Sequence, residues 1–188
     1  MAITNVNLDN VEIKRLPINI FKGMPHLKSV TFHWVAGIYE LPEDLFENNL
    51  ELEYFYMSTS GFSGGATMAD VLPAKFLQNK PNLQKVRFLN TRIKAIPNEA
   101  FSGANHLTSL ELSWNPFLTV GSYICRGCNS LTSISFLGGS INHVSIDAFA
   151  EMPNLVAVDL RQNNLSLLEQ EALIKAYPKI RFDFKFQR

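Results

Sequence analysis

The sequence lacks a long apolar run and an excess of charge of either sign. No window approaches the roughly 20 consecutive apolar residues that a membrane span needs, so we expect no membrane insertion. The 17 basic and 17 acidic residues cancel, so no net field would hold a nucleic acid or an anionic membrane, and we expect neither partner. The first 20 residues carry four charges where a signal peptide would need an apolar stretch. We therefore expect a soluble chain without an export signal, or one cut from a longer or processed protein.

Cysteine and histidine are also scarce, with two and four residues. The cysteines form the motif Cys125-x-x-Cys128, but a zinc site needs a second ligand pair and a redox motif needs a thioredoxin-like setting. The histidines are scattered along the chain and gather with no acidic cluster. We therefore expect no metal, no cofactor and no catalytic residue. The interpretation for the two cysteines is buried structural thiols, with a local disulfide as the alternative in an oxidising compartment.

What the chain does contain is a repeated apolar pattern. Leu-x-x-Leu-x-Leu or a close variant begins at residues 3, 27, 52, 83, 107, 131 and 155, with spacings of 24 or 25 residues and one of 31. The alternation in the second half of each motif predicts a short strand. A fixed period of this length indicates a stack of similar coils, so we expect a single domain over residues 1–188 with about seven repeats.

A second pattern follows each strand, an apolar-Pro pair and then Phe. Examples are Leu16-Pro17 with Phe21 and Ile96-Pro97 with Phe101, while Cys125 takes the Phe position in a later unit. Proline cannot donate to a strand ladder, so it opens a turn toward the other face. One unit alone cannot bury its apolar face, but stacked units form a continuous core between a Leu side and a Phe side. The strands would then form a parallel sheet on the inside of an arc.

The C-terminal end has its own features. Ser166 and Glu169 have the spacing of a capping box, which predicts a true helix directly after them, whereas other outer segments are expected to be single helical or 3₁₀ turns. Residues 180–186 alternate apolar and charged residues and are predicted to be a final capping strand. If Phe182 and Phe184 point inward, its register shifts by one residue.

These columns resemble the leucine-rich repeat family, specifically its 24-residue type, over essentially the whole chain. The resemblance implies an α/β fold, a right-handed solenoid with a parallel sheet on the concave face and short turns on the convex face. It also implies partner binding on the concave face by secreted or cell-surface proteins such as Toll-like receptors and insect immune factors. The segment 123–136 additionally resembles the BspA-like branch. The family's Asn column survives only as Asn115 and Asn163, so we expect a less regular turn after the strands.

The unit with the spacing of 31 residues contains extra glycine-rich material, which we interpret as a loop insertion over residues 61–70. Its segment GFSGG, residues 61–65, matches the nucleophile elbow of hydrolases. That motif requires a strand-turn-helix in a hydrolase sheet, and a repeat unit does not provide one. A hydrolase acting through Ser63 is therefore the weakest functional hypothesis.

Outward-facing strand positions provide the candidate binding residues, because side chains between the buried columns must face the concave surface. Aromatic residues and arginine, which often anchor interfaces, concentrate in the second to fifth units. The predicted ligand-binding residues are Trp34, Tyr54, Tyr56, Lys85, Arg87, Glu111 and Trp114. For the two tryptophans the alternative is packing over the turn that ends the strand.

The functional prediction is a non-catalytic recognition module that binds a protein or peptide, with a glycan as the alternative ligand. The competing hypothesis is a structural or self-associating segment of a larger surface protein, and we expect a monomer or a weak homodimer. An extracellular or cell-surface location follows from the resemblance.

Overall fold

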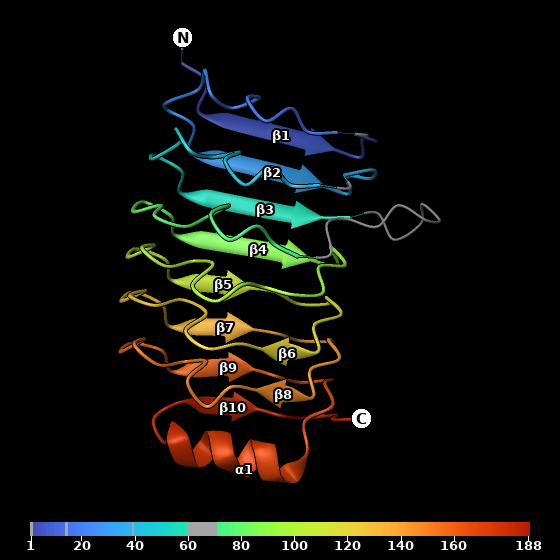
Figure 1. Cartoon of the computed structure of the whole chain (residues 1–188), viewed down its shortest axis with the longest axis vertical. Helices are drawn as coiled ribbons and strands as arrows, with labels where there is room; N and C mark the ends of the chain where they lie inside the picture. The colour runs from blue at the N-terminus through green and yellow to red at the C-terminus, as the bar shows by residue number, and fades with distance from the viewer. Residues whose placement is uncertain (1, 14, 39, 60–70) are drawn as a thin grey trace.

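The computed structural model (Figure 1) describes residues 2–13, 15–38, 40–59 and 71–188. The predicted loop insertion 61–70, with Ser63, lies outside the described residues. The described elements are β1 (Asn5–Asp9), β2 (Ser29–His33), β3 (Tyr54–Ser58), β4 (Lys85–Leu89), β5 (Ser109–Glu111), β6 (Thr119–Val120), β7 (Ser133–Ser135), β8 (His143–Val144), β9 (Ala157–Asp159), α1 (Leu167–Ala176) and β10 (Arg181–Asp183).

Eight of these strands form one parallel sheet in the order β1-β2-β3-β4-β5-β7-β9-β10. Figure 1 shows the strands stacked one above another, each contributed by one coil of the chain. Val86 pairs with Leu110, and Leu110 pairs with Ile134, so the same repeat position recurs in register from strand to strand. The predicted solenoid with its parallel sheet is therefore confirmed.

The core lies between this sheet and the outer segments. The second residue of β2, β3, β4, β5, β7 and β9 is buried, and the Phe column forms the opposite wall of the core. The rings of Phe21 and Phe46 stack with centroids 5.3 Å apart, and those of Phe46 and Phe76 lie 5.2 Å apart. Each unit thus closes the interior of its neighbours, as the two apolar columns predicted.

The outer segments differ between the two halves of the chain. In the early units they are successive turns with hydrogen bonds three residues apart, such as Ile20 N to Pro17 O at 3.0 Å. In later units β6 and β8 add a second, two-stranded parallel sheet, which the sequence interpretation missed. There, residues with an N–H replace proline, and Ser145 N donates to Val120 O at 2.9 Å. A ladder bond can form at this position only where proline is absent.

The turns that end most of the strands share one backbone conformation. Residues at the same repeat position adopt a positive φ between 50° and 73°, and these are Asn10, Trp34, Asn90, Trp114, Gly138 and Gln162. Backbone bonds connect successive turns, including Asn90 N to Ser113 O at 3.1 Å and Trp114 N to Leu137 O at 2.7 Å. Backbone bonds therefore connect turns that lack the family's asparagine, and Asn115 and Asn163 add side-chain bonds of their own. The expected loss of regularity is not seen in these six turns.

The two cysteines are joined in a disulfide and are fully buried. Both cysteines are buried as predicted, and the local disulfide, the alternative left open by the sequence, is the arrangement found. Cys125 occupies the Phe column, and one turn of chain brings its Cα to 5.6 Å from that of Cys128, an ordinary separation for a disulfide.

The C-terminal helix is confirmed, but the final strand is shorter than predicted. Ser166 caps α1, and its side chain and that of Glu169 form the reciprocal bonds of a capping box. β10 covers three residues of the predicted 180–186, because the chain turns after Asp183 and Phe186 adopts a φ of 62°. Phe182 pairs with Val158 and packs against the core, so the inward orientation left open by the sequence is the one found.

Candidate functional site

The concave face is lined by two columns of side chains that alternate with the buried positions of the sheet. Strand register brings each column into line across neighbouring strands. The first column is Asn5, Ser29, Tyr54, Lys85, Ser109, Ser133 and Ala157, and the second is Asn7, Thr31, Tyr56, Arg87, Glu111, Ser135 and Asp159. The bulky members lie on β3 to β5, and the members on β7 and β9 are mostly small.

Five of the seven predicted binding residues come together on β3 to β5. We call Tyr54, Tyr56, Lys85, Arg87 and Glu111 the central patch. Tyr54 lies beside Lys85, and Arg87 lies between Tyr56 and Glu111 in the strand register. Arg87 Nε donates to Glu111 Oε2 at 2.6 Å, and its guanidinium lies over the Tyr56 ring at 5.5 Å from the centroid. Tyr56, Arg87 and Glu111 are thus held together by contacts among their own side chains.

The charges of the central patch are not equivalent. Partial burial opposes the charge on Arg87, but the hydrogen bond and charge of Glu111, with a contribution from Tyr54, raise the pKa of the guanidinium above its ordinary value. Lys85 is exposed and makes no ion pair among the residues that the structure describes. The central patch therefore presents one ammonium group without an ion pair and one guanidinium that is already neutralised by Glu111.

A histidine extends the patch toward the N-terminal strands. His33 Nδ1 lies 2.8 Å from Asp9 Oδ1, and its ring lies 6.0 Å from that of Tyr56. The sequence interpretation did not count His33 and Asp9 among the binding residues. The sequence did contain a signal for this contact. Asp9 and His33 are one repeat unit apart at the same outward position, and such residues are neighbours across parallel strands.

The two predicted tryptophans lie apart from the central patch, on the turns after β2 and β5. Trp34 is 56% exposed and stacks on His33 with ring centroids 4.9 Å apart. Trp114 is 48% exposed and rests against Gly138, where a Cβ would overlap its six-membered ring. Both side chains therefore pack over a turn and still present a large part of the ring to solvent.

A second charged cluster, not predicted from the sequence, lies on β9 and β10. Arg161 Nη2 lies 2.7 Å from Asp159 Oδ2, and Arg161 Nε lies 3.8 Å from Asp183 Oδ2. Partial burial alone would raise the pKa of Asp159, but hydrogen bonds from the Arg161 side chain and backbone, the Arg161 charge and the Ser135 hydroxyl lower it below its ordinary value.

This lowered pKa predicts a pH dependence of stability. A carboxylate with a lower pKa in the folded state stabilises the fold above its unfolded pKa of about 3.9, and this contribution is lost as pH falls through the folded pKa. We expect Asp159→Asn to lower the free energy of unfolding near neutral pH, and this deficit to shrink on acidification. Urea unfolding at several pH values measures it, and Asp147→Asn, at an exposed outer position, is the matched control.

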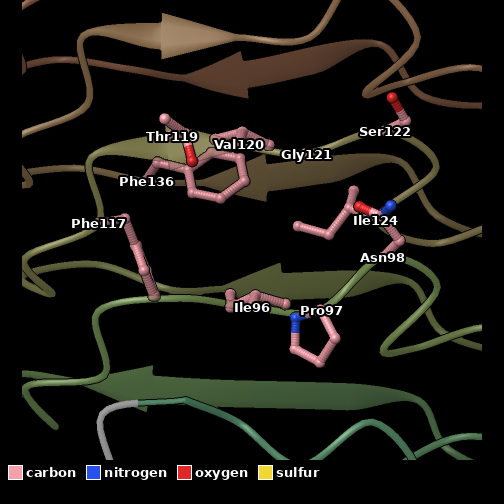
Figure 2. A pocket seen from close by; sticks show the side chains of 10 residues that line it. All are labelled: Ile96, Pro97, Asn98, Phe117, Thr119, Val120, Gly121, Ser122, Ile124 and Phe136. Carbon is pink, nitrogen blue, oxygen red and sulfur yellow. The ribbon is translucent and has the colours of Figure 1, made fainter.

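The cavity drawn in Figure 2 is too small for a substrate. It lies beside β6, and its volume is about 10 Å³, enough for at most one water. Ile96, Phe117 and Phe136 supply apolar walls, and Asn98 and Ser122 are polar members of the lining.

Among the described residues no three His, Cys, Asp or Glu side chains gather as metal ligands. None of the described helical segments has the length and apolarity that a bilayer crossing requires.

Comparisons with known proteins agree with this geometry. The sequence model of the BspA type leucine-rich repeat region matches residues 1–63 and 71–182, in six copies. Leucine-rich repeat-containing G-protein coupled receptor 5 of Rattus norvegicus is 29% identical over 154 residues, which cover 82% of this chain and 16% of the receptor. The corresponding receptor 4 of Bos taurus is 27% identical over 144 residues, 68% of this chain and 15% of the receptor.

Two solved structures share the fold at low identity. The structure of the Toll–Spatzle complex of Drosophila, in its glycosylated form, matches with a TM-score of 0.85 at 18% identity, over 98% of this chain and 24% of the solved chain. The complex of TLR13 with ssRNA13 matches with a TM-score of 0.78 at 17% identity, over 98% of this chain and 25% of that one. The chain therefore spans between about a sixth and a quarter of the length of these relatives.

Proposed function

Because the chain belongs to the leucine-rich repeat family, in its BspA type, we propose that it is a non-catalytic recognition module that binds a protein or peptide through the central patch. The observation that carries the proposal is the fixed arrangement of Tyr56, Arg87 and Glu111 on the concave face. Side chains already held in place lose little conformational entropy when a ligand binds.

The composition of the patch favours a polypeptide ligand over a polyanion. Tyrosine and arginine anchor protein interfaces, and each anchor contributes roughly 2 kcal/mol or more when truncated. Glu111 neutralises Arg87, which leaves Lys85 as the group available to an acidic side chain. A nucleic acid would need several cations along its backbone. We therefore propose a peptide segment with an acidic residue opposite Lys85 and an apolar residue against the tyrosines.

The relatives support ligand recognition in different ways. The solved structure of Toll is a complex with Spatzle, whereas that of TLR13 is a complex with a single-stranded RNA. Glu111 pairs with Arg87 and leaves Lys85 as the single cation of the central patch that is unpaired among the described residues, which is the reason for preferring the first kind of partner here. For the location we propose the cell surface or the extracellular space, since the disulfide between Cys125 and Cys128 persists in oxidising compartments.

The test is a double substitution in the central patch. Peptides selected against the immobilised chain from a displayed library are measured for affinity with the wild type and with Arg87→Glu combined with Tyr56→Ala. The variant places a second carboxylate beside Glu111 and removes the ring under the guanidinium. We expect an affinity loss of more than 100-fold, since two anchors of roughly 2 kcal/mol or more are lost.

The matched control is Arg161→Glu, which reverses a charge on the same face outside the patch. This control should retain wild-type affinity, and circular dichroism should show both variants folded. Equal binding by the patch variant and the wild type would place the ligand elsewhere.

A further inference from the structure

Three exposed aromatic side chains form a row along the ends of the strands. Trp34, Trp114 and Phe186 occupy the same repeat position, each with a positive φ, and are 56%, 48% and 73% exposed. They follow β2, β5 and β10, so three strand steps separate each from the next in the sheet order. At the usual strand spacing this is roughly 14 Å between neighbouring rings. We call these three residues the aromatic row.

The rings of Trp34 and Trp114 are each packed against a neighbouring residue, which limits their motion. Trp34 stacks on His33 at an interplanar angle of 22°, and Asp9 holds that imidazole by a contact of 2.8 Å. The imidazole stacks on one face of the indole, and Trp34 is still 56% exposed. Trp114 rests on Gly138, whose lack of a side chain makes room for the ring. These seats fix the rings before any ligand arrives.

The residues between the rings are polar and uncharged. The same repeat position holds Thr59 and Asn90 between Trp34 and Trp114, and Gly138 and Gln162 between Trp114 and Phe186, so none of these four residues is charged. A protein or membrane interface would be served by a continuous apolar patch, and a nucleic acid by cations along the row. The aromatic row is interrupted by the amide side chains of Asn90 and Gln162. The cations beside it, Arg161 and Lys185, are paired with Asp159 and Asp183.

We propose that the aromatic row binds a neutral linear polysaccharide. A pyranose ring offers an apolar face of C–H groups that stacks on an aromatic ring, with hydroxyls at its edge that bond to amide side chains. A regular polymer presents such faces at fixed intervals and can meet rings that are evenly spaced along one edge. None of its residues belongs to the central patch, although His33, on which Trp34 stacks, lies 6.0 Å from the Tyr56 ring. The proposal does not depend on the function proposed for that patch.

The test uses affinity electrophoresis in gels containing hydroxyethyl cellulose, laminarin or mannan. Trp34→Asn and Trp114→Asn are the informative variants, because asparagine already occupies this turn position at Asn10 and Asn90 with a similar φ. We expect retardation of the wild type by at least one polymer and a loss of roughly tenfold in affinity for each variant. The double variant should migrate as it does without polymer. The chain has two tryptophans, so a shift of their emission on titration reports on the row alone.

Several outcomes would overturn this assignment. One is the absence of retardation and of an emission change with all three polymers, and another is unchanged binding by the asparagine variants. Salt-sensitive binding of oligo(dT), with no binding of the three polysaccharides, would assign the row to single-stranded nucleic acid. Leu168→Ala, at a 76% exposed position of α1, should bind as the wild type does. The double variant of the central patch should also retain polysaccharide binding, and its loss there would count against a separate site.

Discussion

Replacing Phe55 by alanine is expected to lower the free energy of unfolding by about 4 kcal/mol, because the change leaves a cavity at a fully buried position. Phe55 lies on β3, where the sheet side and the Phe column of the core meet. Its ring centroid lies within 5.2 to 6.1 Å of those of Phe32, Phe46, Phe76 and Phe88. Those rings belong to three neighbouring units, so relaxation of one side chain cannot fill the space.

Urea unfolding followed by circular dichroism measures the effect. Leu118→Ala, at a position that is 58% exposed, is the control and should change the free energy of unfolding by less than about 0.5 kcal/mol. A loss for Phe55→Ala no larger than that of the control would mean that the units do not share one packed interior.

Replacing Asn115 by alanine should have the second-largest effect, a loss of roughly 3 kcal/mol. The side chain is 1% exposed and donates through Nδ2 to Phe88 O at 2.9 Å and Leu112 O at 3.0 Å. Its Oδ1 accepts from Thr91 N at 2.9 Å. Alanine would leave these buried backbone groups without partners, which costs more than the bonds themselves contribute.

The control for this prediction is another asparagine that bonds to a carbonyl at the surface. Asn82 Nδ2 donates to Leu50 O at 3.1 Å in an exposed setting, where water can replace the lost bond. Asn82→Ala should therefore cost far less. Similar losses for the two variants, measured by urea unfolding, would show that the Asn115 network is not a major support of the turn.

The fold followed from the sequence because each unit repeats the same few buried positions. Val86, Leu110 and Ile134 recur at one phase of the period, and stacking is the arrangement that buries all three. The β6–β8 sheet was missed because it depends on whether one residue per unit can donate a hydrogen bond. The shared conformation of the turns was not predicted, because different residue types hold this position. Trp34 and Trp114 in particular are residues that rarely adopt a positive φ.

The placement of the candidate site was predictable only in part. The repeat phase placed Tyr56, Arg87 and Glu111 on neighbouring outward positions, and the strand register has them there. The repeat position of a residue did not predict the direction in which its side chain points. The seat of Trp114 on Gly138 depends on the turn geometry, and the ion pair of Arg161 with Asp159 depends on rotamers within one unit.

The contact between Arg87 and Glu111 spans 24 residues, one full coil, as does that between His33 and Asp9. Residues that touch on the concave face are therefore encoded one period apart in the gene. Duplication or deletion of a whole repeat unit would lengthen or shorten this surface by one strand. The buried residues of the coils on either side would still match one another. Ligand range in such a protein can thus evolve through copy number as well as through point substitution.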